Sequence, residues 1–175
     1  VGVAVAHRDR VTVDAVNGTV TIACAPMTTA TRAAAERLLG GFLGGDAHYR
    51  ASANAYGDGG PEALAHALDL FLARPELGFV WLAHAGADVV GACVVCYAIS
   101  TSRGGVVAKL DDMTIDAKWQ GRGVGTSMLG ALAQQLRDAN VGRIDTACHR
   151  ANAGAWRFYA RHGFKPLDEE RIALL

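Results

Sequence analysis

The segment KWQGRGVGTSML, residues 118–129, places three glycines at alternating positions directly before an apolar pattern with helical spacing. The run LDDMTI at 110–115 precedes it and reads as a strand, so the chain passes from strand to helix here. Free N–H groups at the start of a helix attract anions, and glycine lets the backbone approach a phosphate closely. The segment therefore predicts either a phosphate cradle or a tight turn.

Two common nucleotide-binding motifs do not fit this segment. A dinucleotide fingerprint has the spacing G-x-G-x-x-G, whereas Gly121, Gly123 and Gly125 place the third glycine one position early. A Walker loop needs a lysine before its Ser or Thr, but Gly125 directly precedes Thr126. The glycines alone leave the choice between cradle and turn open.

The remaining patterns predict one α+β domain over residues 1–175, with a mixed, mainly antiparallel central sheet flanked by helices. Alternating runs around Asn17-Gly18 predict an N-terminal β-hairpin, in which residues 1–18 form an extension. Helices are predicted over 30–43, 61–75, 123–139 and 152–163, and further strands over 79–85, 88–100, 106–115, 142–149 and 164–175. Residues 44–60, rich in glycine and polar residues, predict a mobile loop.

Composition narrows the class of protein. The 17 basic and 17 acidic side chains cancel, which argues against a nucleic-acid or membrane partner. No apolar run approaches the roughly 18 residues of a membrane span, so we expect a cytoplasmic protein. Cys93 and Cys96 form a C-x-x-C, but residues three apart on a strand face opposite sides, so we expect reduced, buried cysteines and no metal.

A second segment changes how the glycine-rich turn is interpreted. The turn carries Gln120-x-x-Gly123-x-Gly125, and NAGAWRFYARHGF follows about thirty residues later, at 152–164. Together these segments resemble the signature of the GNAT superfamily, the Gcn5-related N-acetyltransferases. The resemblance covers about residues 60–165, and it favours the phosphate cradle over the bare turn.

The resemblance implies a GNAT fold and an N-acetyltransferase that uses acetyl-CoA as acyl donor, without a metal. An acceptor amine would attack the thioester directly in a ternary complex. The compact domain favours a primary amine of a small molecule, and protein N-termini or lysines are the alternative. A catalytically inactive acyl-CoA-binding regulatory module is a further alternative, and a homodimer is compatible with the family.

The resemblance also implies the residues that bind coenzyme A. Backbone amides of the turn would hold the pyrophosphate, and the strand end would pair with pantetheine as a missing strand, with the N–H of Met113 or Thr114 polarising the thioester carbonyl. Asn152 would cap its helix, bond pantetheine, or do both. The full set is Met113, Thr114, Ile115, Gln120, Gly121, Arg122, Gly123, Val124, Gly125, Thr126, Asn152, Ala155 and Phe158.

Tyr159 matches the family's tyrosine that faces the sulfur, which predicts a general acid; a packed core tyrosine is the alternative. The candidates for the general base are Asp111, Asp112 and His149. For each of them, a structural or surface role is an equally good interpretation. Asp111 and Asp112 adjoin on a strand, so we expect them to face opposite sides. Within residues 44–60 we expect ordinary loop residues rather than substrate contacts at His48, Tyr49, Tyr56 and Asp58.

Overall fold

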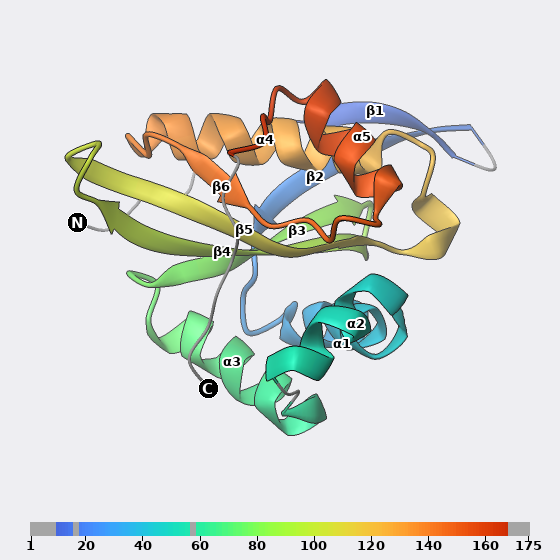
Figure 1. Cartoon of the computed structure of the whole chain (residues 1–175). Coiled ribbons are helices and arrows are strands. Elements are labelled where there is room, and N and C mark those ends of the chain that lie inside the picture. The colour runs from blue at the N-terminus through green and yellow to red at the C-terminus, as the bar shows by residue number, and fades with distance from the viewer. Residues whose placement is uncertain (1–9, 16–17, 57–58, 168–175) are drawn as a thin grey trace.

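The computed structural model describes residues 10–15, 18–56 and 59–167. Within these ranges six strands form one sheet in the order β1-β2-β3-β4-β5-β6, antiparallel except for the parallel β5–β6 pair (Figure 1). The strands are β1 (Arg10–Ala15), β2 (Gly18–Pro26), β3 (Gly78–Ala85), β4 (Asp88–Ser100), β5 (Gly105–Ile115) and β6 (Ile144–Thr146). The α-helices are α1 (Arg32–Gly45), α2 (Ala47–Tyr56), α3 (Gly60–Ala73), α4 (Val124–Asp138) and α5 (Ala153–Arg161), with a 3-10 turn, η1, at Ala117–Trp119.

Helices cover both faces of the sheet, α4 and α5 on one and α1 to α3 on the other (Figure 1). Each face has its own apolar core. On the α4 side, Trp81, Leu110 and Leu132 are fully buried, and the indole Nε1 of Trp81 donates to the carbonyl of Met128 at 3.2 Å. On the other side, Leu39 of α1 and Leu68 of α3 pack against Leu82. The predicted mixed, mainly antiparallel fold is therefore confirmed.

Local signals placed most elements correctly. Ala15 pairs with Gly18 in the predicted N-terminal hairpin, and Pro61 lies in the first turn of α3. Helix α4 buries Val124, Met128, Leu132 and Leu136, which recur every four residues as the pattern required. Strand β6 is shorter than predicted. Of the predicted final strand, residues 164–167 have no strand structure and residues 168–175 lie outside the described residues.

The prediction of a loop over residues 44–60 is wrong for most of its length, because α2 occupies Ala47–Tyr56. Asp46 begins this helix, since its carboxylate accepts a hydrogen bond from the Tyr49 N–H at 2.8 Å and its carbonyl accepts one from the Arg50 N–H. The alanine-rich sequence then favours helix despite its polarity. Asp58 lies outside the described residues, as does the side chain of Tyr56.

All four cysteines have free thiols. Cys24 and Cys93 are buried in the core on the α4 side, as expected, whereas Cys96 and Cys148 are only half-buried. Burial raises the pKa of the Cys93 thiol far above its usual range, so this group stays protonated. In the described part of the chain, no helix combines the length and the apolar character that a membrane crossing requires.

Candidate active site

Strand β5 loses one of its two partners halfway along its length. The parallel pairing with β6 ends where Leu110 meets Thr146, and the Thr146 hydroxyl donates to the Leu110 carbonyl at 2.9 Å. Strand β5 continues to Ile115 and stays paired with β4. Within the described residues, no strand therefore pairs with its backbone from Asp111 to Ile115 on the β6 side, and this open edge is where an extended ligand could add as a strand.

A β-bulge interrupts β5 at the same place. Ala92 pairs with Thr114 but Val94 pairs with Asp111, so β5 has one extra residue, and Asp112 has a φ of +49°. Met113 packs on the α4 side of the sheet, whereas Asp112 lines a pocket on the α1–α3 side. Two adjacent residues thus present different chemistry to the two faces.

The bulge also corrects an expectation about the two aspartates. Asp111 pairs with Val94, and directly paired residues share a face of the sheet. Val94 lines the same pocket as Asp112, so both carboxylates lie on the α1–α3 side rather than on opposite sides. Asp111 forms an ion pair with Lys109 at 2.6 Å, and Asp112 is the one of the two aspartates that lines the pocket.

The glycine-rich turn lies beyond the end of β5. Gly121 and Gly123 have φ values of +72° and +81°, and Gly123 is the N-cap of α4, while buried Val124 anchors the helix on the core. In the described part of the chain, the N–H groups of 121–126 donate no hydrogen bond to another group. Free backbone amides at the start of a helix, with glycines that allow a close approach, are suited to bind a pyrophosphate.

Side chains around the turn hold it in place. The Gln120 amide donates to the Ile115 carbonyl at 2.9 Å, which ties the turn to the end of β5, and the Arg122 side chain is half-buried. The hydroxyl of Thr126 lies 3.3 Å from Nε2 of His162. Burial and the charge of Arg161 lower the pKa of His162, a residue near the turn that sequence reasoning missed.

Helix α5 packs across the start of α4. The Asn152 side chain accepts the N–H of Ala155 at 3.0 Å, which confirms Asn152 as the N-cap of α5. A Cβ placed on Gly125 would lie 3.4 Å from the ring of Phe158, which is an ordinary contact distance, so the two helices pack against each other here. Phe158 therefore supports the turn through packing.

Tyr159 lies on α5 beside the opening in the sheet. Its hydroxyl donates to the sulfur of Met113 at 3.9 Å and also contacts the Thr146 side chain. Its ring packs against Phe164 with ring centroids 5.2 Å apart. Burial raises the pKa of Tyr159 to about 12, an effect that the contact with Thr146 partly offsets, so the phenol keeps its proton at neutral pH.

His149 lies after β6, next to α2. Its ring is 5.3 Å from that of His48, and its Nδ1 accepts the N–H of Ala151 at 3.2 Å. A neutral imidazole whose Nδ1 is an acceptor carries its proton on Nε2. In this arrangement Nε2 is a donor, so His149 is poorly placed to take a proton from an amine.

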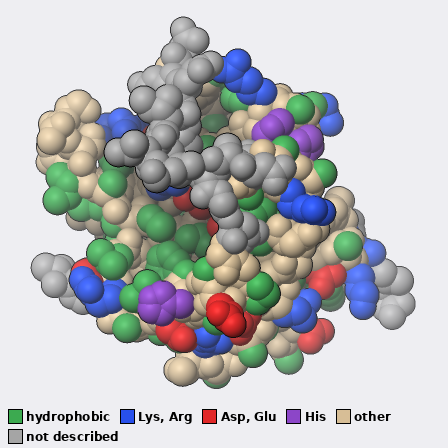
Figure 2. All heavy atoms as spheres, turned by 60° about the horizontal axis from the view of Figure 1, so that its bottom comes forward, with side chains coloured by type: hydrophobic (Ala, Val, Ile, Leu, Met, Phe, Trp, Pro, Cys, Tyr) green, Lys and Arg blue, Asp and Glu red, His purple; other side chains and the backbone are tan. Residues whose placement is uncertain are grey.

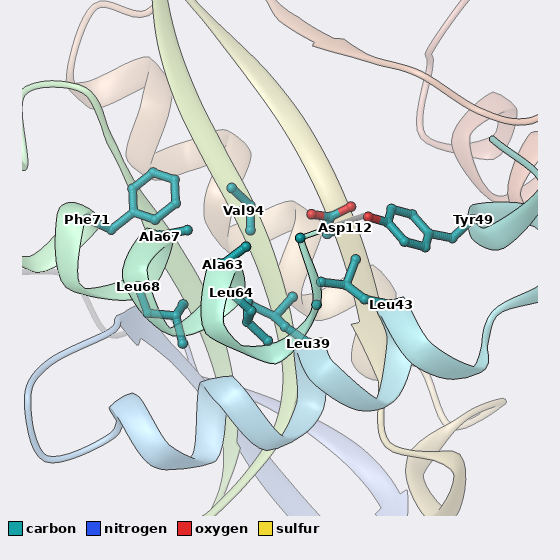
Figure 3. A pocket seen from close by; sticks show the side chains of 12 residues that line it. Leu39, Leu43, Tyr49, Ala63, Leu64, Ala67, Leu68, Phe71, Val94 and Asp112 are labelled. Atoms are coloured by element: carbon teal, nitrogen blue, oxygen red, sulfur yellow. The ribbon is translucent and has the colours of Figure 1, made fainter. Parts of the chain in front are cut away.

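The pocket that contains Asp112 opens on the side of the sheet that carries α1, α2 and α3. Figure 2 views the molecule from this side and shows hydrophobic side chains gathered in a hollow. In Figure 3 the hydroxyl of Tyr49, on α2, and the carboxylate of Asp112, on β5, point toward one another. The sequence did not single out Tyr49, because its pattern predicts a loop where α2 forms.

The family of the chain follows from a direct match. A model of the acetyltransferase (GNAT) family matches residues 46–164, which include the open edge of β5, the glycine-rich turn and α5. The chain therefore belongs to the acetyltransferase (GNAT) family and is an acetyl-CoA-dependent acetyltransferase. The family and the enzyme class predicted from the two sequence segments are confirmed.

Solved structures agree with the fold. An integron cassette protein from the mobile metagenome of Cole Harbour Salt Marsh is 22% identical, with a TM-score of 0.69, over 87% of this chain and 89% of that chain. A ribosomal-protein-alanine N-acetyltransferase from Brucella melitensis biovar Abortus 2308 is 12% identical, with a TM-score of 0.65, over 88% and 99%. An aminoglycoside acetyltransferase from an uncultured soil metagenomic sample is 16% identical, with a TM-score of 0.63, over 88% and 93%.

The raised pKa of Tyr159 makes stability depend on pH in the alkaline range. An unfolded tyrosine ionises near pH 10, whereas Tyr159 in the folded protein keeps its proton up to a pKa of about 12. The stabilisation is complete below pH 10 and is lost as pH rises to 12, by at most about 2.7 kcal/mol. We expect urea unfolding of Tyr159→Phe to show a shallower loss of stability between pH 10 and 12 than the unsubstituted protein; an equal slope would contradict the assignment.

Proposed function

We propose that the chain transfers the acetyl group of acetyl-CoA to the primary amine of a small molecule by direct attack in a ternary complex. The observation that carries the proposal is the open edge of β5 beyond Leu110, which lies between Tyr159 on one face and Asp112 on the other. A thioester in this opening would meet a proton donor from one side and an amine from the other. The chain, residues 1–175, would act as one catalytic domain.

Backbone groups would bind the acyl donor. The amides of Gly121 to Thr126 would hold the pyrophosphate, and the segment Met113 to Ile115 would pair with pantetheine as an added strand. The N–H of Met113 or Thr114 would donate to the thioester carbonyl, where negative charge develops during attack. Gln120 contributes by positioning the turn, because its amide is bonded to the Ile115 carbonyl.

Asp112 is the general base in this proposal. The amine attacks the carbonyl carbon as a C–N bond forms and the C–S bond breaks, and the nitrogen gives a proton to Asp112, directly or through water. Asp112 is favoured over Asp111 because it lines the pocket on the α1–α3 side, from which the acceptor would approach. His149 presents a donor rather than an acceptor at Nε2, so it would orient the acceptor rather than deprotonate it.

Tyr159 would stabilise the departing sulfur. An ordinary thiol has a pKa of about 8.5, so complete proton transfer from a phenol with a pKa of about 12 is uphill. The hydroxyl would therefore act mainly as a hydrogen-bond donor to the developing thiolate and exchange its contact with Met113 for one with the sulfur. This role replaces the predicted proton transfer by a hydrogen bond to the sulfur, which a buried, protonated phenol is suited to donate.

The alternatives predict different measurements. A protein acetyltransferase would acetylate a peptide N-terminus or lysine faster than any free amine. A regulatory module would bind acetyl-CoA without releasing thiol, and it would not require Tyr159 or Asp112. Transfer, rather than binding alone, is favoured because these two side chains lie on opposite sides of one open strand edge.

Acetyl-CoA should raise the melting temperature of the protein, and Gly123→Ala should weaken its binding. Alanine at a φ of +81° strains the turn that presents the amides, so we expect Kd to rise about tenfold. Gly130→Ala is the matched control, because it lies on the same helix with open space around it and should leave Kd unchanged. The absence of any thermal shift with millimolar acetyl-CoA would overturn the proposal.

Asp112→Asn should lower kcat/KM for the acceptor amine by about 10²- to 10⁴-fold, the usual contribution of a general base. Binding of acetyl-CoA should stay unchanged, because the carboxylate faces the acceptor side. Asp111→Asn and His149→Gln are the comparison variants and should lose less activity. A larger loss in either of them, measured as thiol release at saturating acetyl-CoA, would move the base assignment to that residue.

Tyr159→Phe should lower kcat at saturating substrates by about 10- to 100-fold across neutral pH, because one hydrogen bond to the developing thiolate is lost. The Kd of acetyl-CoA should change much less, since the bond strengthens only as charge develops. Thiol release between pH 6 and 9 measures the effect, and an unchanged kcat over this range would refute the role.

A further inference from the structure

The pocket beside Asp112 has an almost entirely apolar lining. Its walls come from α1 and α3, with Val94 on β4 as the floor, and its volume is about 240 Å³. The larger apolar side chains are Leu39, Leu43, Leu64, Leu68 and Phe71. Ligand pockets commonly measure about 300–1,000 Å³, so this one suits a short group rather than an extended one.

Asp112 is the only charged residue among those that line the pocket, within the described part of the chain. Figure 3 shows Asp112 and Tyr49 at one end of the pocket and Phe71 at the other. An ammonium held by Asp112 would lie beside the open edge of β5, and the rest of the molecule would extend away from it between the apolar walls. The pocket therefore has one polar end and one apolar end.

We propose that the acceptor is a monoamine with one short aliphatic or aromatic group, which binds in this pocket with its nitrogen at Asp112. This inference rests on the proposed acetyl transfer and specifies its substrate class. The apolar group gains affinity by leaving water, and the carboxylate selects a single positive charge at the polar end.

The same lining disfavours three other kinds of amine. A polyamine or an aminoglycoside would place further ammonium groups against leucine and phenylalanine side chains with no anion beside them. A free α-amino acid would bring its own carboxylate next to Asp112, where like charges repel. A peptide N-terminus lacks that carboxylate next to the amine. The rest of the peptide chain, however, would have to leave the pocket past its polar end, beside Asp112.

The test compares acceptors that differ by one feature, with thiol release and thermal shift as readouts. We expect kcat/KM to rise about fourfold for each methylene from ethylamine to isopentylamine, since each buried methylene gains this factor. Leucine is isopentylamine with a carboxylate, and its kcat/KM should be at least tenfold below that of isopentylamine. Likewise, 1,4-diaminobutane is butylamine with a second amine, and its kcat/KM should be at least tenfold below that of butylamine. The peptide Leu-Gly-Gly should also fall below isopentylamine.

Ala67→Phe fills the pocket from α3 and is the diagnostic variant, because Ala67 is half-buried in the lining. We expect isopentylamine to lose its advantage and fall to the level of ethylamine, while ethylamine changes less than threefold. Ala73→Phe makes the same change at an exposed position of the same helix, outside the pocket, and should alter neither substrate.

The thermal shift with acetyl-CoA separates the two proposals, because no residue of the cradle lies on α3. The monoamine inference is overturned, and acetyl transfer stands, if both variants keep this shift but kcat/KM does not depend on the chain length of the amine. A higher kcat/KM for the diamine or the peptide than for the matching monoamine has the same consequence. If Ala67→Phe does not fold, the chain-length series in the unsubstituted protein decides alone. If the unsubstituted protein shows no shift with acetyl-CoA, both proposals fall.

Discussion

The site depends on the end of hydrogen-bond pairing between β5 and β6. A strand inside a sheet normally has partners on both edges, yet β5 has none on the β6 side beyond Leu110 within the described residues. Thr146 satisfies the last paired carbonyl with its hydroxyl, so the ladder stops abruptly. The backbone groups that follow can pair with an extended ligand, and every other part of the site is arranged around this edge.

The bulge at Asp112 determines what that edge presents to each side. A regular strand would alternate Asp111, Asp112 and Met113 between the faces, but the extra residue sends Asp112 toward the pocket and Met113 toward Tyr159. In the proposed reaction, the hydrogen-bond donor to the sulfur and the general base are therefore separated by the thickness of one strand. Acyl donor and acceptor can approach a common point from opposite faces without competing for the same space.

The sequence predicted the fold well, and it predicted the elements that carry the proposed donor site, because both depend on local patterns. Apolar spacing defines α4, and the cap at Asn152 defines the start of α5. The acceptor side was predicted poorly. Helix α2 depends on a single cap at Asp46 within a polar stretch, and the positive φ of Asp112 follows from tertiary pairing with β4, which periodicity does not encode.

In the proposed mechanism, donor binding and acceptor choice would depend on different elements of the fold. The turn before α4 would bind the donor through backbone amides, so it would tolerate changes of side chain wherever glycine is kept. The pocket depends on side chains of α1 and α3, and α1 lies outside the residues 46–164 matched by the family model. Neighbours with the same fold include an aminoglycoside acetyltransferase and a ribosomal-protein-alanine N-acetyltransferase. In the proposed mechanism acceptor specificity would therefore reside in the α1–α3 wall, whose leucine and phenylalanine side chains offer no charge to a polycationic acceptor.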